Sequence, residues 1–501
     1  MRTTQKIAIA AIPALLFACA ILLKPISDDE LRSRAIMTDG AAYVTACAPA
    51  LLSGDPCFYP DGGSVGAPGI GDSGLVCNIT SYGAISDAGN MTDAIQAAIN
   101  ACDGGTVVVP AGLYQAGTLT LHSNMVLAIN DGGTLQGVVP ANLDASASLY
   151  PVPTPFPTPN NSNSPPMEQA FVYANGATNL TIQGPGVIDG NGGAPIWSPT
   201  GGTLDYNRPI DVWITNSKNV TLSNVSIINS ALWTLVLAQD TGVLVDTVTI
   251  SSPNASERDG LDIVDSQNVC VSTVNVTSED DGIVLKSGSL IGIDSVHVRN
   301  ATVTGAPSFG NGIKTGTTSY GNFTNLCFEN ANVTNYAEAA IAVESVDGAY
   351  VANVLFSGIT LSNVEAPFFV LFGDRYVLPE GGVKKVGAMS CLTFENIDGG
   401  NITQPWGSAI SGTAVPDAGI LEIHNVTFSN VTLSLLSGNQ APRLRVVPNE
   451  YSGQYPRPNV FGQLPGWAFF TRHADSVTFE NMTLSISAPD SRLPYYLDPP
   501  P

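Results

Sequence analysis

The sequence predicts an all-β fold in which short strands coil into a parallel β-helix, or β-solenoid, with a short helix capping its N-terminal end. From about residue 175 onward, strand-like segments recur, and their starts near 219, 243, 269 and 294 lie about 25 residues apart. A period of roughly 20–30 residues without helices is typical of a β-solenoid. The chain is also sparsely charged, at 12% Asp, Glu, Lys and Arg, and contains 50 Gly and 35 Pro. Many short strands joined by turns explain both features.

The composition excludes several other classes of protein. Disordered chains combine low hydrophobicity with high charge density, whereas this chain is 44% hydrophobic. A helical bundle would be rich in Ala, Glu, Lys and Leu and poor in helix breakers. Only 19 Lys and Arg stand against 42 Asp and Glu, so the net charge is -23. Few cations are therefore available to neutralise phosphates, and we expect no nucleic-acid partner.

The N-terminus has the pattern of a secretory signal. Arg2 and Lys6 form a positive start before a long apolar run, so residues 1–23 are predicted to be a signal peptide or an uncleaved signal anchor. Residues 24–75 lack periodicity and are expected to be an extension or linker. Residues 76–495 would then form a single β-helix domain, and we expect the protein to be secreted, with no membrane contact beyond the signal segment.

The clearest helix is predicted at residues 91–102, where Ile95, Ala98 and Ile99 fall on one face and Asn90 is a candidate N-cap. The segments TVVVP, YQAGTLTL and MVLAIN that follow are short strands separated by turns. This helix would cover the open N-terminal end of the solenoid and protect an exposed edge.

Eight cysteines occur, but none forms a C-x-x-C pair, so we expect no metal site. The cysteines between positions 47 and 102 are close in sequence and could form one or two disulfides in an extracellular setting. Cys270, Cys327 and Cys391 lie in apolar strand-like runs and are expected to be buried as small hydrophobes.

The repeat also creates 15 Asn-x-Ser/Thr sequons. They would permit N-glycosylation in a eukaryotic secretory route. Asn at a turn followed by a β-branched strand produces the same pattern without any glycan. We favour this second explanation for most of the sequons, because solenoid turns stack Asn side chains into ladders.

Acidic residues gather within residues 257–288. Asp259 and Asp262 belong to one predicted rung, and Asp280 and Asp281 to the next, because 21 residues separate Asp259 from Asp280. That separation is close to one solenoid turn, so the side chains should share one face. Like charges held together are unfavourable. Such a cluster therefore indicates either a cation site or acid/base chemistry.

This acidic segment resembles glycoside hydrolase family 28, the polygalacturonases and their rhamnogalacturonan-cleaving relatives in the pectin-lyase-like superfamily. Asp259-Gly260-Leu261-Asp262 matches the first element of the family pattern, and Asp280-Asp281 matches the second. Glu257 and Arg258 replace the Asn-Thr that usually opens it. The resemblance extends from about Ser81 to the end, through IDGNG and RPIDVWITNSKNVTLSNVSIINSALWTL. It implies a right-handed parallel β-helix.

The resemblance also implies inverting hydrolysis of a pectic polysaccharide, without a cofactor or metal, by a chain expected to be monomeric. Inverting carboxyl pairs lie about 6.5–9.5 Å apart, which leaves room for the attacking water. Asp280 would be the general acid, and Asp259 and Asp281 the bases that activate water. The residues expected to bind substrate are Asp262, Lys286, Asn311 and Lys314.

Two departures from the family pattern change the expected substrate. The family His of Gly-His-Gly aligns with Asn311, and its Arg-Ile-Lys aligns with Ala342-Val343-Glu344. In polygalacturonases those cations hold the substrate carboxylate, so their loss argues against ordinary polygalacturonate. Lys286, Lys314 or Arg375 could compensate, and a neutral or mixed-sugar subsite is the other possibility.

Several alternatives stay open from the residues alone. The Asp-Gly pairs could be turns, Asp280-Asp281 a Ca²⁺ site, Asn311 a turn residue, and both lysines solvated. At the level of function, the alternatives are a β-helical polysaccharide lyase and a weak or inactive glycan-binding protein. A tailspike-like adhesin would normally carry a trimerisation module, and we find none in this sequence. Epimerase chemistry is not excluded by the residues alone.

Overall fold

The computed structural model describes residues 74–156, 167–197, 207–254, 256–306, 309–403, 406–416, 419–436 and 447–498. The predicted signal segment 1–23, nearly all of the extension 24–75, and Cys47 and Cys57 lie outside these residues. None of the helices within the described ranges is long and apolar enough to cross a membrane.

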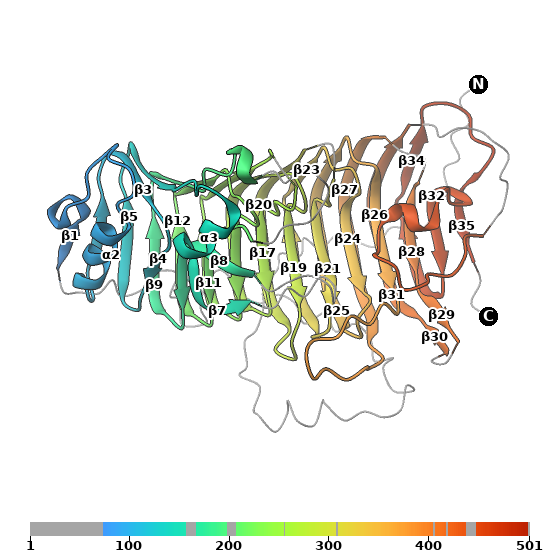
Figure 1. The fold of residues 1–501 in the computed structure, drawn as a ribbon. Coiled ribbons are helices and arrows are strands. Elements are labelled where there is room, and N and C mark those ends of the chain that lie inside the picture. The colour runs from blue at the N-terminus through green and yellow to red at the C-terminus, as the bar shows by residue number, and fades with distance from the viewer. Residues whose placement is uncertain are drawn as a thin grey trace.

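The described chain coils into an elongated stack of rungs (Figure 1). One face is a parallel sheet, here called the site sheet, in which strands pair rung by rung. Its strands are β4 (Leu119–Leu121), β8 (Met167–Asn175), β11 (Ile210–Thr215), β14 (Leu235–Ala238), β17 (Leu261–Val264), β19 (Ile283–Ser287), β21 (Ile313–Ser319), β24 (Ala339–Ser345), β26 (Ala366–Phe372), β28 (Ser408–Ser411), β32 (Gly466–Arg472) and β35 (Leu493–Leu497).

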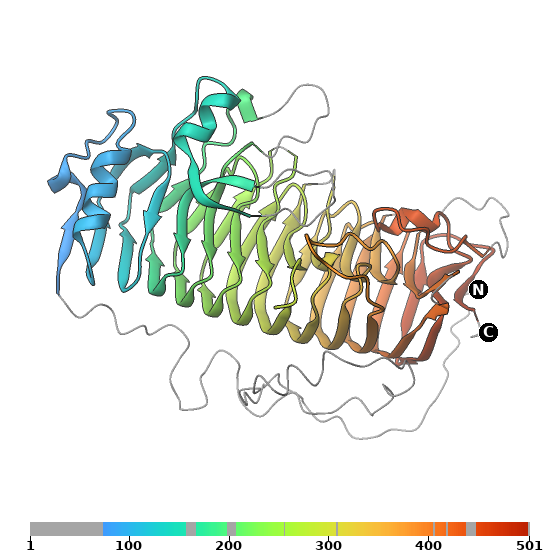
Figure 2. The same cartoon turned by 60° about the horizontal axis from the view of Figure 1, so that its bottom comes forward.

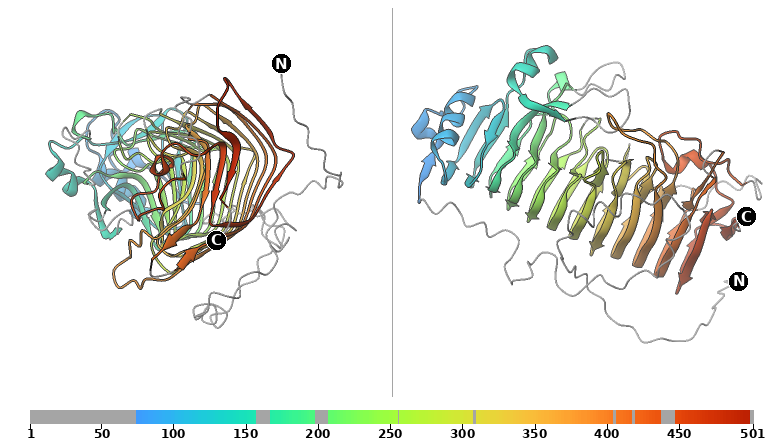
Figure 3. Two further views of the ribbon diagram at one scale, coloured as in Figure 1. Left: turned by 90° about the vertical axis from the view of Figure 1, so that its right-hand side faces the viewer. Right: turned by 90° about the horizontal axis from the view of Figure 1, so that it is seen from below.

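The remaining walls are one long parallel sheet that follows the same axis, as the end-on view in Figure 3 shows. The predicted right-handed parallel β-helix is confirmed. The strands of the long sheet are β1 (Val76–Asn78), β2 (Thr106–Val109), β3 (Gly112–Ala116), β5 (Met125–Ile129), β6 (Gly133–Gly137), β9 (Thr178–Gln183), β10 (Val187–Asp189), β12 (Lys218–Ser223), β13 (Ser226–Ile228), β15 (Thr241–Asp246), β16 (Thr249–Ser252), β18 (Gln267–Ser278), β20 (Ile293–Gly305), β22 (Phe323–Glu329), β23 (Asn332–Thr334), β25 (Tyr350–Ser362), β27 (Ala388–Ile402), β31 (Ile423–Leu435), β33 (Ala474–Glu480) and β34 (Thr483–Ile486).

Short elements decorate this body, mostly on the side of the site sheet (Figure 2). A strand pairs antiparallel with β8 at its outer end, and a small hairpin follows β28. These elements are β7 (Pro151–Phe156), β29 (Thr413–Val415), β30 (Gly419–Leu421), α3 (Leu143–Leu149) and the 3-10 turns η1 (Ile79–Tyr82), η2 (Pro195–Trp197) and η3 (Pro458–Phe461).

The N-terminal end is covered by α2 (Thr92–Ala101), which buries Ile95 and its neighbours against the first rungs. The capping helix is thus confirmed, with one difference at its start. The N-cap residue is Met91, while the Asn90 side chain accepts a hydrogen bond from the Thr92 amide at 3.0 Å. A disulfide between Cys77 and Cys102 ties the end of this helix to β1.

Inward side chains stack in register along the axis. On the site sheet, Leu261, Ile283 and Ile313 are consecutive partners and are fully buried. On the long sheet, phenylalanines stack in parallel, with ring centroids 4.7–5.4 Å apart along the series. That series is Phe328, Phe356, Phe394, Phe428 and Phe479.

Asparagines at the corners explain the Asn-rich repeat. Asn219, for example, has φ 54° and donates its side-chain amide to Asn179 at 3.2 Å. Asn tolerates this left-handed conformation better than most residues, because its short polar side chain bonds locally. Similar pairs recur along the chain, including Asn401 with Asn363 at 2.7 Å. The predicted ladders are confirmed.

The cysteine prediction was right in one part and wrong in another. One disulfide forms between the clustered cysteines Cys77 and Cys102, as expected. Cys270, Cys327 and Cys391, however, are disulfide-bonded rather than free buried thiols. Sequence context failed here because an apolar strand environment suits a thiol and a half-cystine equally well.

Candidate active site

The carboxylates gather where successive chain segments enter the site sheet. Asp259-Gly260, Asp281-Gly282 and Asn311-Gly312 occupy equivalent positions on three rungs, because the Gly260 amide bonds the Asp281 carbonyl and the Gly282 amide bonds the Asn311 carbonyl. A Cβ on Gly260 would lie 2.5 Å from the Gly282 carbonyl oxygen. Only glycine permits that approach, so the Asp-Gly spacing places acidic side chains side by side on neighbouring rungs.

Asp281 is buried and held in its ionised form. One carboxylate oxygen accepts from the Asn311 amide at 2.8 Å and its side chain at 2.9 Å, and the other accepts from Lys314 Nζ at 3.1 Å. Burial opposes ionisation, but the nearby lysines Lys314 and Lys286, with the bonds from Asn311, outweigh it and lower the pKa of Asp281.

Asp259 and Asp262 share one cation. Lys286 Nζ lies 2.6 Å from Asp259 and 2.5 Å from Asp262, and 3.5 Å from the centroid of the Trp233 ring. Burial nevertheless raises the pKa of both carboxyls, that of Asp262 well above its usual range. A single buried ammonium cannot offset the desolvation of two carboxylates.

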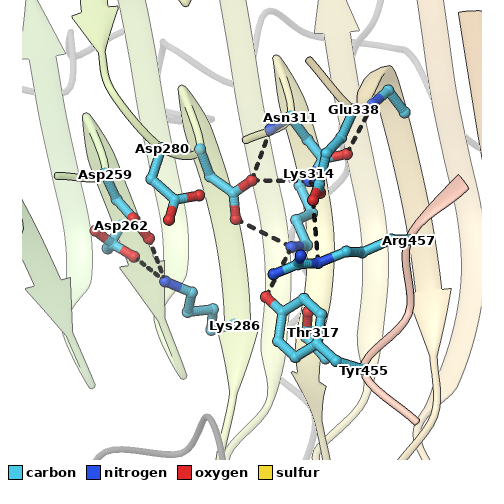
Figure 4. Close-up of polar contacts among 12 residues, drawn as sticks. Asp259, Asp262, Asp280, Lys286, Asn311, Lys314, Thr317, Glu338, Tyr455 and Arg457 are labelled. Atoms are coloured by element: carbon cyan, nitrogen blue, oxygen red, sulfur yellow. Dashed lines mark hydrogen bonds and ion pairs between the residues drawn. The ribbon is translucent and has the colours of Figure 1, made fainter. Parts of the chain in front are cut away.

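Asp280 has a different environment from its neighbours. Figure 4 shows it between Asp259 and the group around Asn311 and Lys314. It is half-buried, and burial together with the charges of Asp259 and Asp281 raises its pKa well above the usual range. The adjoining Glu279 is also affected, since burial and the nearby Glu257 raise its pKa to about 7. The pKa of Asp280 is therefore raised beside a carboxyl, Asp281, whose pKa is lowered.

The structure brings all of the predicted site residues together. Asp259 and Asp280 lie in one cluster with Asp262, Lys286, Asn311 and Lys314, the four residues expected to bind substrate (Figure 4). Asp281 belongs to it through its bonds from Asn311 and Lys314. Those four, Asp262, Lys286, Asn311 and Lys314, are at most 3% exposed and contact other residues of the site. The reading of both lysines as solvated is wrong. A direct contact between these residues and substrate stays a prediction.

Sequence reasoning missed a second layer beside Asn311. The Asn311 side chain also donates to Glu338 at 2.9 Å, and Arg457 lies 3.1 Å from the other Glu338 oxygen. Tyr455 accepts from Lys314 at 3.4 Å (Figure 4). Glu338 occupies the same position in its rung that Asp280 occupies two rungs earlier. An alignment of the repeats could therefore have identified Glu338. Tyr455 and Arg457 come from a non-repetitive segment and gave no signal.

The expected substitutes for the lost family cations are all paired with acids. Arg375 forms an ion pair with Asp347 beyond the end of β24. Glu344, which the sequence pattern aligns with a family lysine, is 1% exposed, and one of its oxygens has no hydrogen-bond partner within the described residues. Burial raises the pKa of Glu344 to about 8, although Lys314 opposes the shift. The site therefore holds more carboxyls than free cations.

One group of possible metal ligands lies elsewhere, on the long sheet: His297, Cys327 and Glu329. His297 Nε2 lies 2.9 Å from Glu329. Cys327 is disulfide-bonded, so it offers no thiolate. The trio accordingly lacks the ligand that would make it a strong site for a transition metal.

Comparisons with known proteins agree with this geometry. Residues 103–433 match the family model described as "Glycosyl hydrolases family 28". An endo-polygalacturonase of Pectobacterium carotovorum subsp. carotovorum is 28% identical over 333 residues, which cover 62% of this chain and 78% of that protein. A putative galacturan 1,4-alpha-galacturonidase A of Aspergillus flavus is 26% identical, with 54% and 67% covered.

Solved structures show the same fold. An exopolygalacturonase from Thermotoga maritima superposes with a TM-score of 0.59 at 19% identity, covering 72% of this chain and 87% of that one. A family 28 exopolygalacturonase from Yersinia enterocolitica gives a TM-score of 0.57 at 18% identity, with 84% and 79% covered.

Proposed function

This chain belongs to glycosyl hydrolases family 28, and from that premise we propose that it cleaves a glycosidic bond of a pectic polysaccharide with inversion of configuration. One observation carries the proposal. Asn311 and Lys314 hold the Asp281 carboxylate, whereas no described side chain bonds the adjacent Asp280 carboxyl. Consistent with this, the pKa is lowered for Asp281 and raised for Asp280. A proton donor beside an ionised base is the pair that inverting hydrolysis requires.

The steps follow from these protonation states. Asp280 donates its proton to the glycosidic oxygen as the bond from that oxygen to the anomeric carbon breaks. A water molecule attacks the anomeric carbon from the opposite face and loses a proton to the Asp281 carboxylate, with Asp259 as the second base. Exchange with solvent then restores the starting protonation states. Lys286 and Lys314 keep the two bases in place, and Asn311 positions Asp281.

The charges favour a neutral sugar on the side of Lys314. Lys314 is paired with Asp281, Arg457 with Glu338, and a buried carboxyl, Glu344, occupies the place of a family cation. A substrate carboxylate at this position would face acids without an available cation. We propose a mixed pectic backbone, in which a neutral unit sits beside the cleaved bond.

Export and a monomeric state stay predictions. The Cys77–Cys102 disulfide supports export, because disulfides persist in oxidising compartments. The apolar run near the N-terminus supports it independently.

The test is a panel of pectic polymers and oligomers, including homogalacturonan and alternating-sugar backbones, with the anomeric form of the first product read by NMR. Inverted product from a mixed backbone supports the proposal, and retained configuration or an unsaturated product contradicts it. Binding without cleavage on every substrate would favour the glycan-binding alternative.

A matched variant tests the acid. Asp280→Asn is expected to lower kcat by about 10²–10⁴-fold, the usual contribution of a general acid. Its thermal unfolding should match the wild type, because Asn has the same shape and no hydrogen bond within the described residues joins the Asp280 carboxyl to another group. An Asp280→Asn enzyme of normal activity would remove Asp280 from the mechanism.

A further inference from the structure

The outer face of the site sheet is covered on the C-terminal side of the carboxylates. Residues 447–464, here called the strap, lie across β24, β26, β28 and β32. Outward residues of these strands are fully or nearly fully buried in one apolar cluster with strap side chains. The sheet contributes Ala342, Phe369, Ala409 and Phe470, and the strap contributes Tyr451, Phe461 and Leu464.

The contacts trace the path of the strap from one edge of the sheet to the site. It starts beside the end of β32, where Arg472 donates to the Pro448 carbonyl at 2.7 Å. Tyr451 packs against Gly373, directly after β26, because a Cβ on that glycine would lie 2.7 Å from its ring. The tip then reaches Lys314 through Tyr455 and Glu338 through Arg457.

The strap returns over the same strands and is held by buried groups. Phe461 packs on Phe369 and Phe470, with ring centroids 6.3 Å apart in both cases. Arg492 donates to the Leu464 carbonyl at 3.0 Å where the strap ends. Aromatic packing and the bonds from Arg472 and Arg492 hold both ends of the strap, which forms a wall over the sheet.

The position of the wall relative to the carboxylates has a consequence for the substrate. Lys314 on β21 and Ala342 on β24 are register partners, so the covered floor begins one strand spacing, about 4.8 Å, from the cation that holds Asp281. A polysaccharide running along the solenoid axis meets Tyr455 and Arg457 almost immediately past Asp280 and Asp281 (Figure 4).

We propose that the strap restricts this enzyme to the end of a polysaccharide chain, so that each cut releases one short product of fixed length. The inference rests on the proposed hydrolytic function and adds the mode of cutting. A groove open at both ends accepts internal bonds, whereas a floor filled beside the carboxylates admits only a chain that terminates there.

The test uses the polymer that the substrate panel shows to be cleaved. The full-length protein digests it while viscosity, reducing ends and product sizes are measured together. Chain-end cutting predicts one dominant short product from the first minutes, while viscosity falls slowly relative to the bonds cut. A rapid loss of viscosity with products of many lengths overturns the inference and leaves the hydrolase assignment intact. If no substrate is cleaved, both the chain-end inference and the hydrolase assignment are wrong.

Variants of the strap test whether it causes the chain-end cutting. Tyr455→Ala combined with Arg457→Ala removes the tip, and longer products should then appear at the expense of the dominant one. Asn459→Ala is the matched control, because Asn459 is exposed on the same strap, and its product pattern should equal the wild type. A double variant that folds, cuts and keeps the wild-type pattern overturns the role of the strap.

Discussion

At the scale of single residues, the site depends on how differently neighbouring carboxyls are solvated and paired. Asp281 has three hydrogen-bond donors around it, while no side-chain partner of Asp280 exists within the described residues. Burial therefore raises the pKa of Asp280, whereas the donors around Asp281 outweigh burial and lower the pKa of that carboxyl. A bell-shaped pH profile follows, with Asp281 governing the acidic limb and Asp280 the alkaline limb.

Asn311→Ala should move only the acidic limb. The change removes the side-chain bond that lowers the pKa of Asp281. A hydrogen bond to a charged group contributes about 1.5–3 kcal/mol, so we expect the acidic limb to rise by roughly one to two pH units. The measurement is kcat/KM against pH, with the exposed Asn332→Ala as control. Lower activity with an unmoved acidic limb would contradict the positioning role.

Glu344→Gln should stabilise the protein in alkaline solution. The folded state raises the pKa of Glu344 from 4.5 to about 8, so folding favours the protonated form. The contribution of protonated Glu344 to the free energy of unfolding is complete below the pKa of the unfolded state, and it is lost as the pH rises through the pKa of the folded state. Gln stays neutral throughout and avoids the loss.

Thermal unfolding of both proteins at about pH 5 and about pH 9 checks this prediction, since linkage predicts that Glu344→Gln is more stable than the wild type only at the higher pH. Glu380→Gln is the control, because Glu380 is exposed. A variant that is less stable at the higher pH would mean that ionised Glu344 is needed as a partner of Lys314.

The carboxylates were predictable from the sequence because they form a contiguous pattern whose spacing equals one rung. Lys286 and Lys314 were also predicted as site residues, but their ion pairs with Asp259, Asp262 and Asp281 were not, because spacing does not reveal side-chain geometry. Tyr455 and Arg457 were missed entirely. They reach the site from more than 100 positions away along a segment without periodicity.

At the scale of elements, the stacked phenylalanines of the long sheet hold the later rungs together. Phe394 is fully buried, and its ring lies 5.2 Å from that of Phe356 and 4.7 Å from that of Phe428. Phe394→Ala should cost about 3–5 kcal/mol in the unfolding free energy of these rungs, which is the usual cost of such a truncation.

Denaturant unfolding followed by hydrogen exchange across β25, β27 and β31 measures that loss. Phe394→Leu retains most of the volume and is expected to be the milder change. Equal effects of the two substitutions would mean that the stabilisation comes from ring stacking rather than from the buried volume, because both remove the ring and only Leu keeps most of the volume.

Strand and helix positions were largely predictable, because alternating apolar residues and Asn corners repeat from rung to rung. The early strands and the α2 cap follow the prediction closely. The short helix α3 was not predicted, since the apolar residues of LDASASL alternate with polar ones as in a strand. The cysteine pairing failed for a related reason, because partners in space leave no local trace.

At the scale of the whole molecule, the net charge of -23 acts on any anionic substrate. Salt should lower KM for a substrate rich in carboxylates, because screening shortens the reach of repulsion to about 8 Å at physiological ionic strength. A substrate with fewer charges should respond less. KM measured for both across a salt series tests this, and a KM that rises with salt for the anionic substrate would reveal a cationic site.

The strap also changes how the molecule can come apart. A solenoid behaves like a one-dimensional array, in which end rungs fray before central ones. Here the last rungs are tied by residues 447–464 to the rungs that carry the carboxylates. Loss of the C-terminal end would therefore withdraw Tyr455 and Arg457 from the centre, so damage at one tip of the array would uncover the floor beside the carboxylates several rungs away.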